Sequence, residues 1–108
     1  MSIPDTIREL VRDLVRERYP GQPTFQALAA QDYPEVQIRQ GDILVCLPVK
    51  GNLADGKIAA VAWEGKMVFG RAVRVGHQVQ LGDELYPMHM LRGIVLMAIR
   101  EGRRPQES

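Results

Sequence analysis

The sequence has one cysteine and two serines, and each shortage excludes a class of chemistry. Cys46 has no partner for an internal disulfide, and it lacks the paired spacing of a zinc site. Because it lies in the apolar run ILVCL, we expect it to be a core residue. Ser2 and Ser108 stand at the two ends of the chain, so its central part offers no serine nucleophile.

An excess of charge of one sign and a long hydrophobic run are also missing. The 14 basic and 13 acidic side chains give a formal net charge of +1, which excludes a strong overall field for nucleic acid or an anionic membrane. No apolar run approaches the roughly 20 residues of a membrane-spanning helix, and the N-terminus lacks the order of a signal peptide. We therefore expect a soluble, cytoplasmic protein with no membrane partner, and 108 residues predict a single domain, 1–108.

What is present begins with an amphipathic helix over residues 1–20. Apolar side chains recur at steps of three and four residues, at Ile3, Ile7, Leu10, Val11, Leu14 and Val15. This spacing gathers them into one packing stripe, in which we expect Leu10 to be covered by the sheet or by a second subunit. Ser2 and Asp5 fit a capping box at the start of the helix, and Pro20-Gly21 ends it.

The polar face of this helix carries two rows of opposite charge. The acidic row is Asp5, Glu9, Asp13 and Glu17, and the basic row is Arg8, Arg12 and Arg16. An arginine three residues after an acid contributes only about 0.2–0.5 kcal/mol per pair. The pattern is typical of a solvated helix face, and it also fits antiparallel pairing with the same helix of a second copy.

Residues 21–40 form a connecting region that contains the prolines of YPGQP and DYP. Between them, TFQALAAQ predicts a short helix capped by Thr24. Residues 41–100 change to strand patterns, with a hairpin at Glu64-Gly65 and a closing strand in MLRGIVLMAIRE that contains Gly93. We expect Gly93 to permit a close backbone approach and residues 101–108 to be a flexible tail. The predicted fold is mainly β (α+β), an N-terminal helix followed by a small coiled antiparallel sheet.

Three stretches in this order carry a family resemblance: IRQGDILVCL, LADGKIAAVAWEGKMVFGRAVRVGHQVQL and YPMHMLRGIVLMAI. Together they resemble the C-terminal self-cleaving serine peptidase domain of LexA-like repressors, a domain similar to signal peptidases. The resemblance covers roughly residues 32–100. It implies a coiled antiparallel β-domain of the LexA C-terminal type.

The resemblance also implies where a serine–lysine dyad would stand. The family's serine precedes the glycine-aspartate that is here Gly41-Asp42 by about eight residues, which falls near Tyr33. The family's lysine precedes an arginine on the strand after the hairpin, and Gly70 occupies that position before Arg71. Such a mechanism needs a nucleophile beside a neutral amine, and both are missing at their places. We therefore expect a non-catalytic domain with no cofactor.

Other chemistry has weaker support in the sequence. His77, Asp83, Glu84 and His89 match no compact ligand motif, so no metal site is predicted. An enzyme with unconventional residues would depend on Cys46 or on Lys66, and burial suppresses the reactivity of a thiol. A nucleic-acid-binding accessory protein would use Arg71 and Arg74, gathered on one sheet face. The scattered aromatics and the missing recognition helix argue against that partner.

The leading prediction is a protein-interaction module. In the resembled family this domain dimerises and holds an extended segment of chain by strand-to-strand hydrogen bonding, and both uses survive the loss of a dyad. We expect a homodimer or a captured protein or peptide strand, within a repressor or phage-type regulatory circuit. The residues expected to interact are Arg8, Glu9, Arg12, Asp13, Arg16, Arg71 and Arg74.

Overall fold

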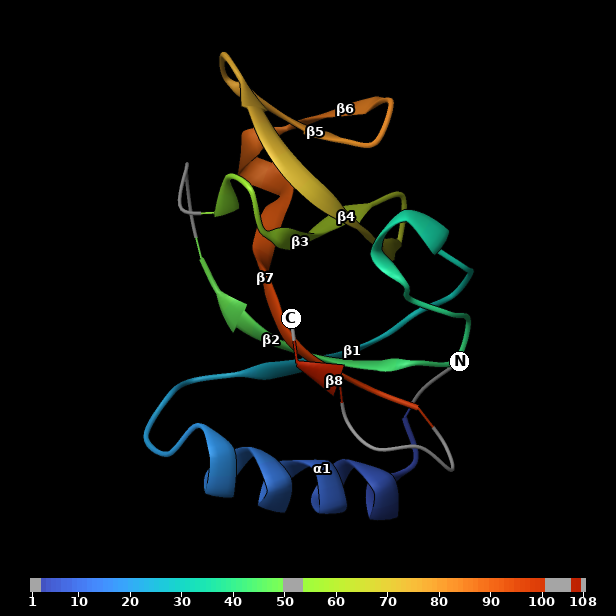
Figure 1. The fold of residues 1–108 in the computed structure, drawn as a ribbon, viewed down its shortest axis with the longest axis vertical. Helices are drawn as coiled ribbons and strands as arrows, with labels where there is room; N and C mark the ends of the chain where they lie inside the picture. Colours follow the sequence, from blue (N-terminus) through green and yellow to red (C-terminus); the bar gives the residue numbers. More distant parts are fainter. Residues whose placement is uncertain (1–2, 50–53, 101–105, 108) are drawn as a thin grey trace.

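The computed structural model describes residues 3–49 and 54–100 and the backbone of residues 106–107. One helix, α1 (Asp5–Arg18), lies beneath the β1 and β2 end of a curled antiparallel sheet (Figure 1). The sheet contains β1 (Phe25–Leu28), β2 (Ile43–Pro48), β3 (Ile58–Trp63), β4 (Lys66–Val75), β5 (Gln78–Leu81), β6 (Glu84–Pro87), β7 (Leu91–Ile99) and β8 (Gln106–Glu107). The 3-10 helices η1 (Pro34–Val36) and η3 (Met88–Met90) also lie in the described part of the chain. The expectation of a mainly β fold with an N-terminal helix is confirmed.

The strand order is β1-β2-β7-β3-β4-β5-β6, and β8 pairs with β7. β7, the last of the long strands along the chain, therefore lies in the middle of the sheet, between β2 and β3. Gly93 is the point of closest packing there, because an added Cβ would lie 2.5 Å from the carbonyl oxygen of Leu47. The predicted strand and the predicted close approach at Gly93 are both confirmed.

The hairpin between β3 and β4 is the one that the sequence indicates. Trp63 pairs with Lys66, which leaves a two-residue turn at Glu64 and Gly65. Both turn residues have positive φ, 49° and 78°. This combination defines the primed turn whose twist matches that of the flanking strands, and glycine supports it at the second position.

Two local predictions in the N-terminal part are wrong. In TFQALAAQ, residues Phe25–Leu28 form strand β1 and not a helix. The backbone pairs with β2, and Ala27 and Ala29, two residues apart, both point into the core. Helix α1 begins at Asp5 after Pro4, and no side-chain capping hydrogen bond forms at that end. Ser2, the other half of the predicted capping box, lies outside the described residues.

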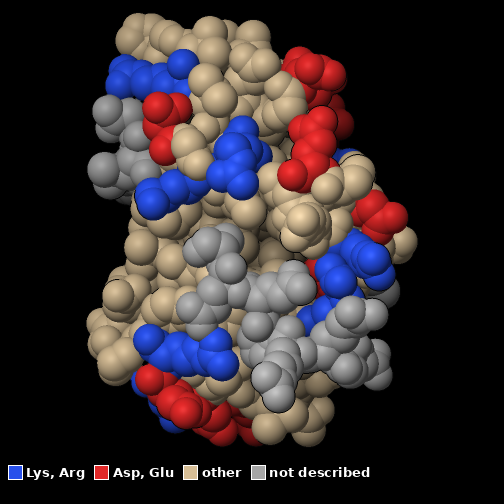
Figure 2. Space-filling model, viewed as in Figure 1, with Lys and Arg blue, Asp and Glu red and all other residues tan. Residues whose placement is uncertain are grey.

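The apolar stripe of α1 packs on one side only. Val11 and Val15 are buried against Ile43, Val45 and Met97 of the sheet, in a cluster that includes Ile3. Leu10 is 70% exposed, and Ile7 is 40% exposed. Successive helical residues differ by about 100°, so a helix that seats Val11 on the sheet turns Leu10 to the side. Of the two covers expected for Leu10, the sheet is excluded, and a second subunit stays a prediction. Figure 2 shows acidic and basic side chains at the α1 end of the visible surface.

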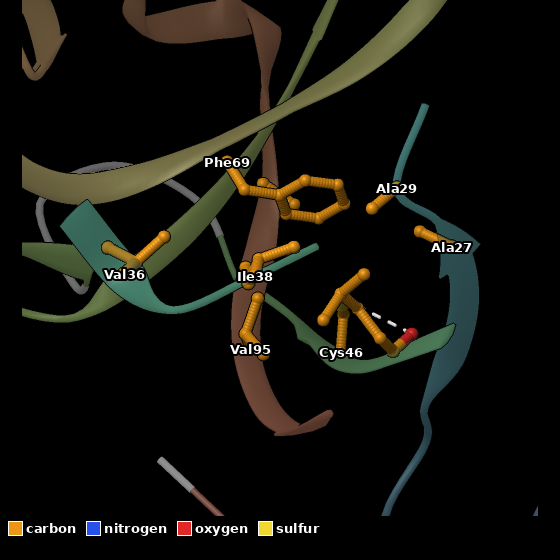
Figure 3. Packing of buried hydrophobic residues seen from close by; sticks show 9 residues of the cluster. Ala27, Ala29, Val36, Ile38, Cys46, Phe69 and Val95 are labelled. Carbon is orange, nitrogen blue, oxygen red and sulfur yellow. Dashed lines mark hydrogen bonds between the residues drawn. The ribbon is translucent and has the colours of Figure 1, made fainter. Parts of the chain in front are cut away.

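The interior of the curled sheet is a core of small and medium side chains (Figure 3). It contains Ala27, Ala29, Val36, Ile38, Leu44, Cys46, Ala60, Phe69 and Val95. Cys46 is fully buried there, as predicted, and burial raises the pKa of its thiol to about 12. Of the predicted tail, residues 106–107 pair with Met97 and Ala98 as β8, and the rest lies outside the described residues.

Candidate functional site

The two positions that the resemblance assigns to a dyad lie in one cleft. Tyr33 stands just before η1 and Gly70 lies in β4, and both line a small cleft of about 280 Å³. The ring of Tyr33 packs edge-on against Phe69, with 5.6 Å between the ring centroids. Its hydroxyl donates a hydrogen bond of 3.2 Å to the carbonyl oxygen of Met67. The sequence spacing therefore identifies two positions that the fold brings together.

The side chains at these positions suit packing. An added Cβ at Gly70 would lie 2.9 Å from the Cβ of Leu81, so a lysine side chain there would require β5 to move. Burial, and to a lesser extent Tyr86, raises the pKa of Tyr33 above its ordinary value. The phenol therefore stays protonated at neutral pH and acts as a hydrogen-bond donor.

A larger cleft of about 790 Å³ lies between the end of β1 and the β3–β4 hairpin. Its lining residues are Leu28, Ala30, Ala62, Trp63, Glu64, Gly65, Lys66, Met67 and Met90. Its walls are thus mainly apolar, with two charged residues near the hairpin tip. Lys66, the alternative base considered from the sequence, donates a hydrogen bond of 3.2 Å to the side-chain oxygen of Gln31 and ties the tip to the connecting region.

The β4 side of this large cleft is a strand edge. Residues 66–71 of β4 pair with β3, while only residues 72–75 pair with β5. In a two-residue hairpin the flanking residues form a hydrogen-bonded pair, and every second residue along β4 then bonds to β3. The hydrogen bond from the Ala72 amide to the Lys57 carbonyl fits this alternation. The backbone groups of Met67 and Phe69 consequently point to the other edge, where residues 66–71 have no strand partner in the described chain.

The β1 side of the large cleft is a second strand edge. β1 pairs with β2 along one edge, and no other strand of the described chain pairs with it. The amide of Ala29 donates to the Asp42 carbonyl, so Ala29 and every second residue before it face β2. The backbone groups of the residues between them, Gln26 and Leu28, therefore point away from β2. Two strand edges without a strand partner in the described chain therefore border one apolar cleft, and on the β4 edge the Met67 carbonyl already accepts the Tyr33 hydroxyl.

A buried ion pair, Asp42 with Arg100, lies next to the end of β1, where the Asp42 carbonyl accepts the Ala29 amide. The carboxylate of Asp42, 1% exposed, accepts two hydrogen bonds of 2.9 Å from the Arg100 guanidinium and one from the Arg39 amide. Burial raises the pKa of Asp42, but these hydrogen bonds and the nearby positive charges outweigh it and hold the pKa below its ordinary value. The sequence indicated only a turn at Gly41-Asp42, and no local pattern connects it to Arg100.

The arginines of the sheet do not form one basic face. Arg71 donates to the carbonyl of Gly56, and Arg74 donates to the carbonyl of Gly76. The register of β4 is continuous, so two residues three positions apart point to opposite faces. The expected shared face is therefore wrong, and Figure 2 shows basic side chains in separate groups on the visible face.

The charged rows of α1 lie on its exposed face. Arg8, Glu9, Arg12, Asp13 and Arg16 are all exposed. A guanidinium nitrogen of Arg16 lies 3.6 Å from a carboxylate oxygen of Asp13, three residues earlier, as the sequence spacing indicated. The described residues contain no group of three histidine, cysteine or acidic side chains arranged to hold a metal ion.

Comparison with models of protein families gives no match, and comparison with curated protein sequences gives none either. Among the described residues, no helix has the length and apolar character needed to cross a membrane.

Proposed function

We propose that the protein is a non-catalytic interaction module that captures an extended peptide segment in the large cleft. The observation that carries this proposal is the pair of unpaired strand edges, β1 and the first half of β4, on either side of a mainly apolar cleft of about 790 Å³. In this proposal the fold is a LexA-like peptidase domain that has lost its dyad, and the regulatory circuit rests on that resemblance alone.

Strand addition suits these two edges for a physical reason. An extended peptide gains main-chain hydrogen bonds from exposed donors and acceptors, while pockets for alternate side chains supply specificity. Gln26 and Leu28 offer backbone groups on one side. On the other side the Met67 amide and the backbone of Phe69 remain, because the Met67 carbonyl already accepts the Tyr33 hydroxyl. The apolar walls around Met67, Met90 and Trp63 then receive an apolar side chain.

The chemistry at the two dyad positions supports a binding role. A general base at position 70 would have to displace Leu81, and the hydroxyl of Tyr33 is already engaged by Met67. The accessory nucleic-acid role loses its support, because Arg71 and Arg74 do not share a face.

The test blocks the large cleft without disturbing the core. Ala30 is exposed and lines the cleft, so Ala30→Trp fills it, whereas Gln78→Trp places the same ring on an exposed residue of β5 outside the lining. Decapeptides selected from a random phage library on the whole chain are synthesised, and their binding is measured by fluorescence anisotropy. We expect Ala30→Trp to abolish binding and Gln78→Trp to retain it. Binding that is indifferent to Ala30→Trp, or no enriched peptide at all, would contradict the proposal.

Self-association through α1 is a second candidate. It is favoured by the exposure of Leu10 and Ile7, two apolar residues that the sheet leaves uncovered beside the charged rows. A second copy of the helix would bury them.

A further inference from the structure

A third hollow lies at the other end of β1. It is a basic groove of about 320 Å³ between α1 and β1, lined by Arg8, Arg12, Val15, Thr24, Phe25 and Gln26. Arg8 and Arg12 are one helical turn apart on the same row, so their guanidinium groups reach the same space. The groove therefore places two positive charges beside a free strand edge.

Arg8 and Arg12 differ from five other arginines of the described chain, whose guanidinium groups have partners. Arg16 pairs with Asp13, and Arg100 pairs with Asp42. The guanidinium groups of Arg71, Arg74 and Arg92 each donate to a backbone carbonyl. Within the described residues, the guanidinium groups of Arg8 and Arg12 make no ion pair or hydrogen bond, although Asp5 and Glu9 stand three residues before them. Their donors are available to an anionic group.

The floor of the groove joins the helix to the strand. The side-chain amide of Gln26 donates a hydrogen bond of 3.2 Å to the carbonyl oxygen of Arg8, which holds β1 against the first part of α1. The amide oxygen of the same group, Oε1, is buried and receives no hydrogen bond from the residues that the structure describes. The position of the groove is thus fixed by a contact between the helix and the strand.

We propose that this basic groove binds an acidic side chain of the same extended peptide that the large cleft captures. The inference rests on the proposed function, because β1 is the strand that connects the two hollows. Thr24 and Gln26 line the groove, and Leu28 and Ala30 line the cleft. Thr24 and Ala30 bound this track, and an extended peptide advances along it in step with β1, about 3.3 Å per residue, so about one to five residues lie between the acidic and the apolar residue of the peptide.

The chemical basis is a carboxylate that accepts hydrogen bonds from two guanidinium groups. Charge-assisted hydrogen bonds of this kind are stronger than neutral ones, and arginine presents a planar fork that matches a carboxylate. Because both arginines are exposed, we expect a gain in affinity at the upper end for surface ion pairs, about five-fold for glutamate over glutamine. The gain should shrink between 0.05 and 0.5 M sodium chloride, because salt screens exposed charges.

The probe is a series of fluorescein-labelled decapeptides built from alanine and threonine. Each contains one leucine for the large cleft and one glutamate, with one to five residues between them, in both chain orders. A matched series carries glutamine in place of glutamate. Binding to the whole chain is measured by anisotropy. We expect the glutamate preference to appear at one chain order and separation. It should disappear in the double variant Arg8→Gln/Arg12→Gln and persist in Arg16→Gln, which changes the same row outside the groove.

The outcomes separate the two proposals. Peptides that bind equally well with glutamate and glutamine, or a preference that survives the double variant, would overturn the basic groove as a site and leave peptide capture intact. If no peptide of either series binds, both proposals fail. A folded double variant, verified by an unchanged melting temperature, is the condition for each comparison.

Discussion

The Asp42–Arg100 pair predicts how much the free energy of unfolding falls when one partner is removed. In Asp42→Ala, the guanidinium of Arg100 loses two hydrogen bonds of 2.9 Å and the amide of Arg39 loses its acceptor. Breaking a buried pair from one side costs about 3–5 kcal/mol. The side chain of Arg100 is 25% exposed and regains some water, so we expect the low end of that range, about 3 kcal/mol. For a domain of this size the melting temperature should fall by on the order of 15 °C.

Urea denaturation followed by circular dichroism measures this change. Asp83→Ala is the matched control, because Asp83 is exposed and its loss should alter the free energy of unfolding by less than about 0.5 kcal/mol. A loss below about 1 kcal/mol in Asp42→Ala would refute the reasoning, since it would mean that the carboxylate gains nothing net from its partners.

The same pair predicts a dependence on pH. The pKa of Asp42 is lowered in the folded protein, so the stabilisation is complete above the unfolded value of about 3.9 and is lost as the pH falls through the folded value. The parent chain should therefore lose stability below about pH 4 more steeply than Asp42→Ala does. Parallel slopes for the two proteins in that range would contradict the lowered pKa.

The remaining predictions concern packing, association and reactivity. Gly93→Ala should cost about 2–4 kcal/mol, because its Cβ would meet the Leu47 carbonyl oxygen at 2.5 Å; an unchanged urea midpoint would exclude that contact. Leu10→Asp should leave the melting temperature within a few degrees of the parent, since Leu10 is 70% exposed, and it should weaken any dimer seen in sedimentation equilibrium; an equal dimer would remove α1 from the interface. Cys46, with a pKa of about 12, should resist Ellman's reagent at pH 8 until urea unfolds the chain, and fast labelling of the folded protein would disprove its burial.

Two residues of the small cleft could be predicted to lie together from the sequence, because the resemblance follows a spaced pattern. The spacing of the resemblance points to Tyr33 and Gly70, which line one cleft in the fold. The strand edges and the basic groove could not be predicted, because the three alanines of TFQALAAQ favour a helix and are depleted in strands, so local propensity points away from β1. Only its pairing with β2 turns this segment into the strand that borders both the large cleft and the basic groove.

By itself, the sequence determined the features that arise within one element. The packing stripe at Val11 and Val15, the turn at Glu64-Gly65 and the closing strand around Gly93 each follow from periodicity or turn chemistry over a few residues. Tertiary structure decided which flank of α1 faces the sheet, that β7 occupies the middle of the sheet, and that Arg100 reaches Asp42. The physical reason is that these outcomes depend on contacts between distant segments, which compete in packing and hydrogen bonding and leave no mark in the local pattern.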